Sequence, residues 1–126
     1  MKINKISVTT TNLPQTISFY SSLGLKFPKP KKDEQHIESI PQPGEPALMI
    51  DTVELTEEIT GAKPIPGTHS VFAIEYDSSE EVDQIIEKLK KEGFKIEKEP
   101  WKAFWGQYYA IVMDPEGYKV DLYVNL

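Results

Sequence analysis

The sequence predicts one α+β domain made of two similar halves, and three observations lead to this prediction. Several short stretches alternate between apolar and polar residues, as strands do. Two other stretches have helical spacing, and each follows the opening strand of its half. Both halves show the same order of a strand, a helix and about three strands, which indicates an internal structural duplication. The length of 126 residues suits a single domain.

The first half opens with a predicted strand over residues 2–10, where β-branched residues alternate with polar ones. A helix is expected next. Asn12 is a typical N-cap residue, and Pro14 suits the first helical turn because its missing N–H has no partner there. Gly24 is expected to end this helix.

Three further extended segments complete the first half in this interpretation: residues 25–27, 35–40 and 47–53. The residues that follow contain two glycines and two prolines and show no sustained periodicity, which is typical of a linker. We therefore expect a first module over about residues 1–54, a linker over 55–67 and a second module over 68–126, all within one domain.

The second half begins with a predicted strand over residues 68–76. Ser78 and Glu81 have the spacing of a capping box, in which each side chain accepts from an exposed backbone N–H at the helix start. The helix after them has an apolar stripe at positions i, i+3, i+4 and i+7, formed by Val82, Ile85, Ile86 and Leu89. Gly93 is expected at the C-terminal cap.

A short strand is expected over 94–97, followed by a hairpin. Its two strands, 107–113 and 118–124, are rich in β-branched and aromatic residues. Residues 114–117 read Asp-Pro-Glu-Gly, which favours a tight turn between them.

Composition excludes several classes of function. The chain has no cysteine, which rules out disulfides, thiolate catalysis and thiolate metal sites. A net charge of −6 and a pI near 4.9 disfavour nucleic acid and anionic membranes as partners. No apolar stretch is long enough to cross a bilayer, and the N-terminus lacks the apolar block of a signal peptide. We therefore expect a soluble cytoplasmic protein. All 14 basic residues are lysine, so guanidinium recognition of carboxylate or phosphate is excluded.

The sequence resembles the vicinal oxygen chelate superfamily, which includes glyoxalases, bleomycin-resistance proteins and extradiol dioxygenases. Two patterns in the expected order carry the resemblance: Ser18-Phe19-Tyr20-x-x-Leu23-Gly24-Leu25-x-Phe27 in the first half, and Phe104-Trp105-Gly106 followed by Asp114-Pro115-Glu116-Gly117-Tyr118-x-Val120-Asp121-Leu122 in the second. The resemblance implies two βαβββ modules that form curved mixed sheets around a cavity, commonly as a homodimer. Fold alone does not give function.

The resemblance also implies four metal-ligand positions, which fall on Lys5, on Met49 with Asp51 nearby, on either His69 or Val71, and on Asp121. A protonated lysine repels a divalent cation, and a methionine thioether is a soft ligand unsuited to the metals usual in this family. No metal is therefore expected. The alternative is one divalent ion, such as Zn²⁺, Ni²⁺ or Mn²⁺, held by His69, Asp121 and a third carboxylate. We also hypothesise that Lys5 and Asp121 form an ion pair where relatives hold metal.

Aromatic residues are dense between positions 101 and 109: Trp101, Phe104, Trp105, Tyr108 and Tyr109. Such side chains wall cavities for flat ligands, although core packing or a dimer contact is the simpler alternative. His36 and Glu38 share a strand face, but their charged surroundings favour a solvated edge. The candidate pocket-lining residues are Lys5, Ser7, Met49, Asp51, His69, Val71, Trp101, Trp105, Tyr109 and Asp121.

These observations predict a glyoxalase/bleomycin-resistance-like protein that binds a small, partly aromatic molecule without a metal, as a homodimer. One alternative is a metal-dependent glyoxalase-like lyase or isomerase, or a thiol transferase. Another is a protein kept for protein interaction alone, which predicts a filled cavity.

Overall fold

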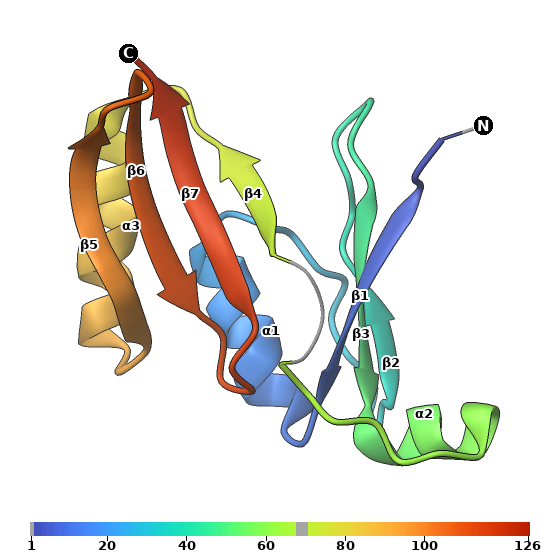
Figure 1. The fold of residues 1–126 in the computed structure, drawn as a ribbon. Helices are drawn as coiled ribbons and strands as arrows, with labels where there is room; N and C mark the ends of the chain where they lie inside the picture. The colour runs from blue at the N-terminus through green and yellow to red at the C-terminus, as the bar shows by residue number, and fades with distance from the viewer. Residues whose placement is uncertain (1, 68–70) are drawn as a thin grey trace. The chain divides into compact units, whose positions relative to one another are not determined.

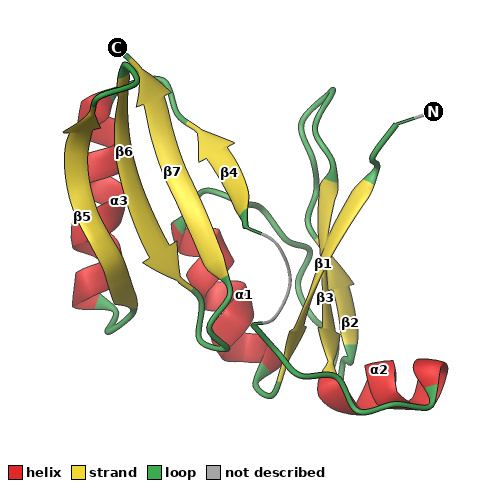
Figure 2. Ribbon diagram, viewed as in Figure 1, coloured by secondary structure: helices red, strands yellow, loops and turns green. Residues whose placement is uncertain are grey.

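The computed structural model describes residues 2–67 and 71–126, and backbone contacts divide the chain into two compact units, Met1–Gly67 and Thr68–Leu126 (Figure 1). Each unit has a mixed sheet and at least one helix (Figure 2). The predicted α+β class is therefore confirmed. In the part of the chain that is described, no helix is both long and apolar enough to span a membrane.

The first unit has a three-stranded sheet and two helices: β1 (Lys5–Thr10), α1 (Leu13–Ser22), β2 (His36–Glu38), β3 (Ala47–Thr52) and α2 (Val53–Thr60). The strand order is β1-β3-β2, with β1 parallel and β2 antiparallel to the central β3. Alternation within the strands separates an apolar face, which includes Val8 and Ile50, from a polar face with Lys5 and Asp51.

The sequence correctly predicts how α1 begins. The Asn12 side chain accepts a hydrogen bond from the backbone N–H of Gln15, so it caps one of the donors that lack a partner at a helix start. The hydroxyls of Thr10 and Thr16 lie 2.8 Å apart and are fully buried, which ties α1 to β1 on the apolar face of the sheet. This contact places the polar face on the opposite side from α1.

Two predictions for the first unit are wrong. The stretch interpreted as a linker contains α2, which Thr52 caps through the N–H of Leu55 and which ends at Gly61 in the left-handed conformation. Only Val53 of this helix is buried, so it has no apolar stripe for sequence periodicity to detect. Residues 25–27 form no strand. The backbone there makes isolated hydrogen bonds: the N–H of Ile40 donates to the carbonyl of Lys26, and the N–H of Leu25 donates to the carbonyl of Tyr20.

The second unit has a four-stranded sheet and one helix: β4 (Phe72–Glu75), α3 (Ser79–Lys91), β5 (Lys95–Ala103), β6 (Gln107–Met113) and β7 (Lys119–Asn125). The strand order is β4-β7-β6-β5, with β4 parallel to β7 and the other pairs antiparallel. In both units the opening strand is parallel to a partner strand that comes later in the chain. The first unit lacks a counterpart of β5.

The helix α3 covers one face of this sheet (Figure 2). Ser78 accepts from the N–H of Glu81, as the capping box predicts, while the Glu81 carboxylate accepts from the N–H of Asp77 rather than of Ser78. The stripe buries Val82, Ile86 and Leu89, and several even-numbered residues of β6 and β7, such as Val112 and Leu122, are buried on the same side of the sheet.

The strand β5 extends six residues beyond its predicted end, from 97 to 103. Two register irregularities against β6, one before and one after Lys98, break its alternation. Its last part pairs Trp101 with Tyr109 and Ala103 with Gln107. As a result, the aromatic stretch that follows position 100 is partly strand, and its side chains have defined faces.

Candidate functional site

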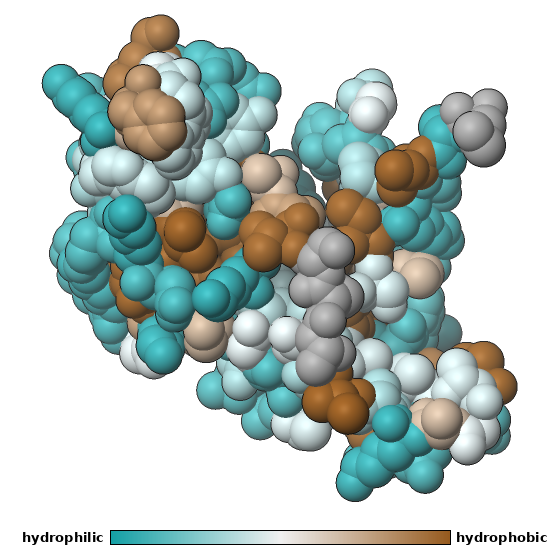
Figure 3. Space-filling view, in the orientation of Figure 1, coloured by the Kyte–Doolittle hydropathy of each residue, from teal (hydrophilic) through white to brown (hydrophobic). Residues whose placement is uncertain are grey.

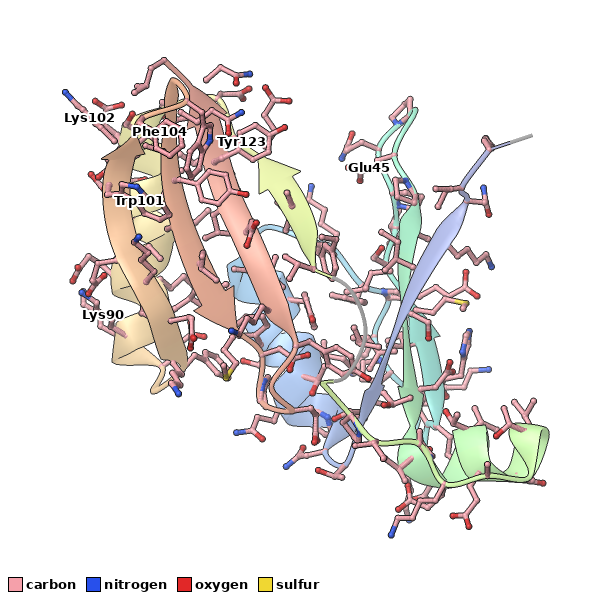
Figure 4. The ribbon with its side chains drawn as sticks, viewed as in Figure 1. Glu45, Lys90, Trp101, Lys102, Phe104 and Tyr123 are labelled. Carbon is pink, nitrogen blue, oxygen red and sulfur yellow. The ribbon has the colours of Figure 1, made fainter. Side chains whose placement is uncertain are left out.

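The face of the second sheet opposite α3 carries a cluster of four aromatic rings. Trp101 on β5, Tyr109 on β6 and Tyr123 on β7 are directly paired across the strands, and Trp105 packs onto them from the β5–β6 turn. We name these four residues the aromatic face. Figure 4 shows Trp101 and Tyr123 on neighbouring parts of the sheet. This region has mostly intermediate hydropathy in the space-filling view (Figure 3).

The rings of the aromatic face hold one another in fixed orientations. Trp105 meets Trp101 and Tyr109 edge to face, with ring centroids 6.0 and 5.3 Å apart, and Tyr109 stacks on Tyr123 at 6.0 Å. Such geometries stabilise aromatic pairs beyond the area that they bury. Trp105 nevertheless keeps 49% of its surface exposed. The cluster is thus an ordered surface that is open to solvent, unlike a packed core.

A chain of polar side chains runs along one end of the aromatic face. The indole N–H of Trp105 donates to Gln107 at 2.8 Å, the Gln107 amide donates to Asn125 at 2.9 Å, and the Asn125 amide donates to Glu75 at 2.9 Å. These bonds connect the β5–β6 turn to β6, β7 and β4. They fix the Trp105 ring and place the Glu75 carboxylate beside Tyr123, its partner in the strand register.

A carboxylate lies within the aromatic face. Tyr109 donates its hydroxyl hydrogen to Oδ2 of Asp121 at 2.5 Å. Burial, and then the hydrogen bond to Asp121, raise the pKa of Tyr109 to about 12, so the hydroxyl keeps its proton at neutral pH. Oδ1 of Asp121 has no hydrogen-bond partner among the described residues, and this oxygen is available to a ligand donor.

One cation contacts the aromatic face. The ammonium group of Lys98 lies 3.9 Å from the ring centroid of Trp101, which is a cation–π contact. The other lysines on this side of the sheet, Lys95 and Lys119, lie at the opposite end of the strands. Both pair with Glu97, at 4.0 and 3.3 Å.

The polar face of the first sheet holds a second cluster. Lys5 donates to Glu38 at 2.7 Å, and the two ring nitrogens of His36 contact Glu38 at 2.9 Å and Asp51 at 2.5 Å. The four side chains come from all three strands, and Met49 lies between Ser7 and Glu38 in the register. We name them the charged network.

Charges within the network perturb one another. The hydrogen bond to Asp51 raises the pKa of His36 above its ordinary value of 6.5, against a smaller opposing effect of burial. The hydrogen bond from Lys5, followed by that from His36, lowers the pKa of Glu38. These contacts favour the protonated imidazole of His36 and the ionised carboxylate of Glu38.

A depression of about 390 Å³ also lies along the solvent side of α3. Its lining consists of long polar side chains from successive helix turns: Asp83, Gln84, Glu87, Lys88 and Lys91. It offers no aromatic surface and lies across the sheet from the aromatic face. We therefore assign it no part in the site.

A family profile described as the Glyoxalase/Bleomycin resistance protein/Dioxygenase superfamily matches residues 2–122 of this chain. The chain belongs to this superfamily. The resemblance seen in the sequence is therefore confirmed. A comparison with curated proteins found no match.

Solved structures from the superfamily share the fold at low identity. A glyoxalase-related enzyme from Fulvimarina pelagi has a TM-score of 0.84 at 19% identity, over 99% of this chain and 88% of that one. A superfamily enzyme from Burkholderia phytofirmans PsJN has a TM-score of 0.79 at 16% identity, over 100% of both chains. A lactoylglutathione lyase from Agrobacterium tumefaciens has a TM-score of 0.70 at 20% identity, over 98% of this chain and 92% of that one. At these identities the likeness shows the fold alone.

The described residues at the superfamily's metal positions do not fit a divalent ion. The Lys5 ammonium is a donor paired with Glu38, Met49 offers a thioether, and Val71 offers no side-chain donor atom. Asp121 is a hard ligand but accepts from Tyr109, and Asp51, which lies near the second position, contacts His36. Across residues 2–67 and 71–126, no group of three or more His, Asp or Glu side chains is arranged to hold a metal.

The structure places the remaining candidates as follows. Ser7 is half-buried on β1 beside Met49, on the face of the charged network. Val71 precedes β4 and is 51% exposed. His69 lies outside the described residues. The pair predicted between Lys5 and Asp121 joins different units and stays a prediction, while each of the two has a partner in its own unit.

Two aromatic residues of the 101–109 stretch lie outside the aromatic face. Tyr108 points to the other side of β6 and donates to Asp83 of α3 at 2.6 Å, and Phe104 is 97% exposed in the β5–β6 turn, which Figure 4 shows at the end of these strands. Sequence reasoning missed Tyr123 and Lys98. Residues two apart in a strand lie on the same face, so the position of Tyr123 two residues after Asp121 could have indicated that it belongs to the site.

Proposed function

We propose that this superfamily member binds a small, flat, partly aromatic molecule on the aromatic face, without a metal. The observation that carries the proposal is the set of four oriented rings on an open sheet face, with Oδ1 of Asp121 unpaired among the described residues. Ligand sites are mostly apolar with a few placed polar groups, and this surface has that composition.

The contact area indicates how much of the affinity the rings supply. A bicyclic ligand that covers about 150 Å² of apolar surface gains about 4 kcal/mol at 25 cal/mol per Å². Such a free energy alone corresponds to a Kd of about 1 mM. Tighter binding therefore requires the polar groups, so Asp121 and the chain from Trp105 to Glu75 are expected to set selectivity.

The metal-free part of the proposal rests on the donor set. Three of the family's four ligand positions carry described residues other than the usual His or Glu, and the charged network gives Lys5 and His36 partners of their own. A cation brought to Lys5 would have to displace its ion pair with Glu38. These contacts favour a protein whose charged side chains pair with one another and do not hold a metal ion.

The test uses quinoline, which is flat and neutral at pH 7.5, as the probe. Both tryptophans of the chain belong to the aromatic face, so their two indole N–H signals in a ¹H–¹⁵N spectrum report on it directly. We expect both signals to shift in a saturable way with quinoline and not with cyclohexanol. Linear shifts without saturation, or equal shifts with cyclohexanol, would contradict the proposal.

Two tyrosines on opposite faces of the second sheet provide a test variant and a control variant. Tyr123→Leu removes a ring from the aromatic face and is expected to weaken quinoline binding about fivefold or more, in line with the loss of one aromatic contact. Tyr108→Phe changes a tyrosine on the opposite face of the sheet and should leave the affinity unchanged. Equal effects of both variants would indicate a general loss of structure.

We further propose that the protein forms a homodimer, as the family resemblance implies. The fully exposed Phe104 is an apolar side chain that a second copy would cover. Light scattering coupled to gel filtration measures the mass directly. We expect about twice the 14.4 kDa of one chain, and a monomer at all concentrations would refute this part.

A further inference from the structure

We infer that the ligand of the aromatic face is a planar organic cation. The Lys98 ammonium group competes with this cation for the face of the Trp101 ring. The inference rests on the proposed function and adds the charge of the ligand to it.

Charges around the aromatic face favour a cation. Two carboxylates flank Tyr123: Asp121 precedes it by two residues on the same face of β7, and Glu75 is its partner on β4. Each has one oxygen bonded within the unit, to Tyr109 and Asn125 respectively. The two lysines at the far end of the strands share Glu97 as their partner, which offsets one of their two charges. An anionic ligand would meet two like charges, whereas a cation would meet two opposite ones.

The contact between Lys98 and Trp101 also favours a cationic ligand, because the face of the Trp101 ring already binds a positive charge of the protein. The Lys98 ammonium lies 3.9 Å from the Trp101 centroid, a distance at which the ring's negative face attracts positive charge. No ion pair holds Lys98 to a described carboxylate. Its side chain is therefore free to leave Trp101, and a planar cation that stacks there would replace one cation–π contact with another.

This arrangement predicts an unusual effect of removing a positive charge. In wild type, a ligand has to displace Lys98 and then lies close to a like charge. In Lys98→Met the cation–π contact that the ligand must break and the like charge both disappear, while a side chain of similar length is kept. An exposed cation–π contact corresponds to about a two- to fivefold change in affinity, so the variant is expected to bind a cation about two- to fivefold more tightly.

The experiment compares two probes of nearly equal shape. N-methylquinolinium carries a permanent positive charge, and quinoline is neutral at pH 7.5. Both are titrated against the tryptophan indole signals in wild type, Lys98→Met and Lys102→Met. Lys102 is the control lysine because it lies on the same strand but on the opposite face, where Figure 4 shows it pointing away from the sheet.

We expect wild type to prefer N-methylquinolinium over quinoline, Lys98→Met to increase that preference, and Lys102→Met to leave it unchanged. Asp121→Asn keeps an acceptor for the Tyr109 hydroxyl but removes the charge, and should reduce the preference for the cation about fivefold. Raising the salt concentration should weaken binding of the cation only.

The possible failures differ from one another. Equal affinity for both probes in all variants would overturn the charge inference and leave the proposed function standing. Weaker cation binding in Lys98→Met would show that Lys98 supports the ligand and does not compete with it. If neither probe produces saturable shifts, the proposed function itself fails.

Discussion

Replacing Asp114 with alanine removes the acceptor that holds the turn between β6 and β7. Asp114 is 3% exposed, and its Oδ1 accepts from the backbone N–H groups of Glu116 at 2.8 Å and Tyr118 at 2.9 Å. The turn also closes through a backbone bond from the Asp114 N–H to the Tyr118 carbonyl. This turn fixes the register that sets Tyr109 opposite Tyr123.

The size of the effect follows from these contacts. A hydrogen bond to a charged group contributes about 1.5 to 3 kcal/mol, and the buried Tyr118 N–H would lose its partner, so we expect a destabilisation of about 3 kcal/mol. With an unfolding entropy of about 2.1 cal/mol/K per residue, this lowers the Tm of a chain of this size by about 11 °C. Asp114→Asn keeps an acceptor oxygen and should lose about half as much.

The assay is thermal and urea unfolding followed by far-ultraviolet circular dichroism, with Glu58→Ala, an exposed carboxylate on α2, as the control. A loss below about 1 kcal/mol in Asp114→Ala would refute the reasoning, because the buried Tyr118 N–H would then be satisfied without the carboxylate. A loss of equal size in Asp114→Ala and Asp114→Asn would show that a neutral acceptor cannot replace the charged carboxylate.

Three further predictions follow from the charged network, the donor set and the cap of α2. The pKa of His36 is raised above 6.5, so the contribution of His36 to stability is complete below pH 6.5 and is lost as the pH rises through the folded-state pKa. Proton NMR titration should show the raised pKa of His36, and Asp51→Asn should lower it. After separate dialysis against Ni²⁺, Zn²⁺ and Mn²⁺, elemental mass spectrometry of tag-free protein should find far less than one metal per chain; stoichiometric retention that His69→Ala abolishes would favour the metal enzyme instead. Thr52→Ala removes the N-cap of α2 and should cost about 1 kcal/mol in urea unfolding, while Thr56→Ala, inside the helix, should cost less.

Local signals in the sequence were enough to predict α1, α3 and the hairpin of β6 and β7. Asn12 and Ser78 predicted the starts of α1 and α3, and the Asp-Pro-Glu-Gly turn predicted β6 and β7. Periodicity failed for α2, because seven of its eight residues are not buried and helical spacing carries no hydropathy signal without a buried stripe. It failed for the second part of β5 because irregular register removes alternation.

The sequence predicted some of the site residues, but those whose position depends on contacts between strands could not be predicted. Trp101, Tyr109 and Asp121 were candidates from residue type and alternation, and the strand register places them on one face. Lys98 could not be assigned a face, because the irregularities on both sides of it shift the parity of β5. His36 and Glu38 were expected at a solvated edge, but the long Lys5 side chain reaches over β3 to form the charged network, which no local pattern encodes.

The location of both tryptophans in one cluster has a consequence for optical experiments on this protein. Intrinsic emission excited at 295 nm comes only from Trp101 and Trp105, which lie in the second unit. An unfolding curve recorded by fluorescence therefore follows that unit, and a transition confined to residues 2–67 would pass unseen. If curves from fluorescence and circular dichroism coincide, the two halves melt as one cooperative body; if they separate, the difference measures how independently the first half unfolds.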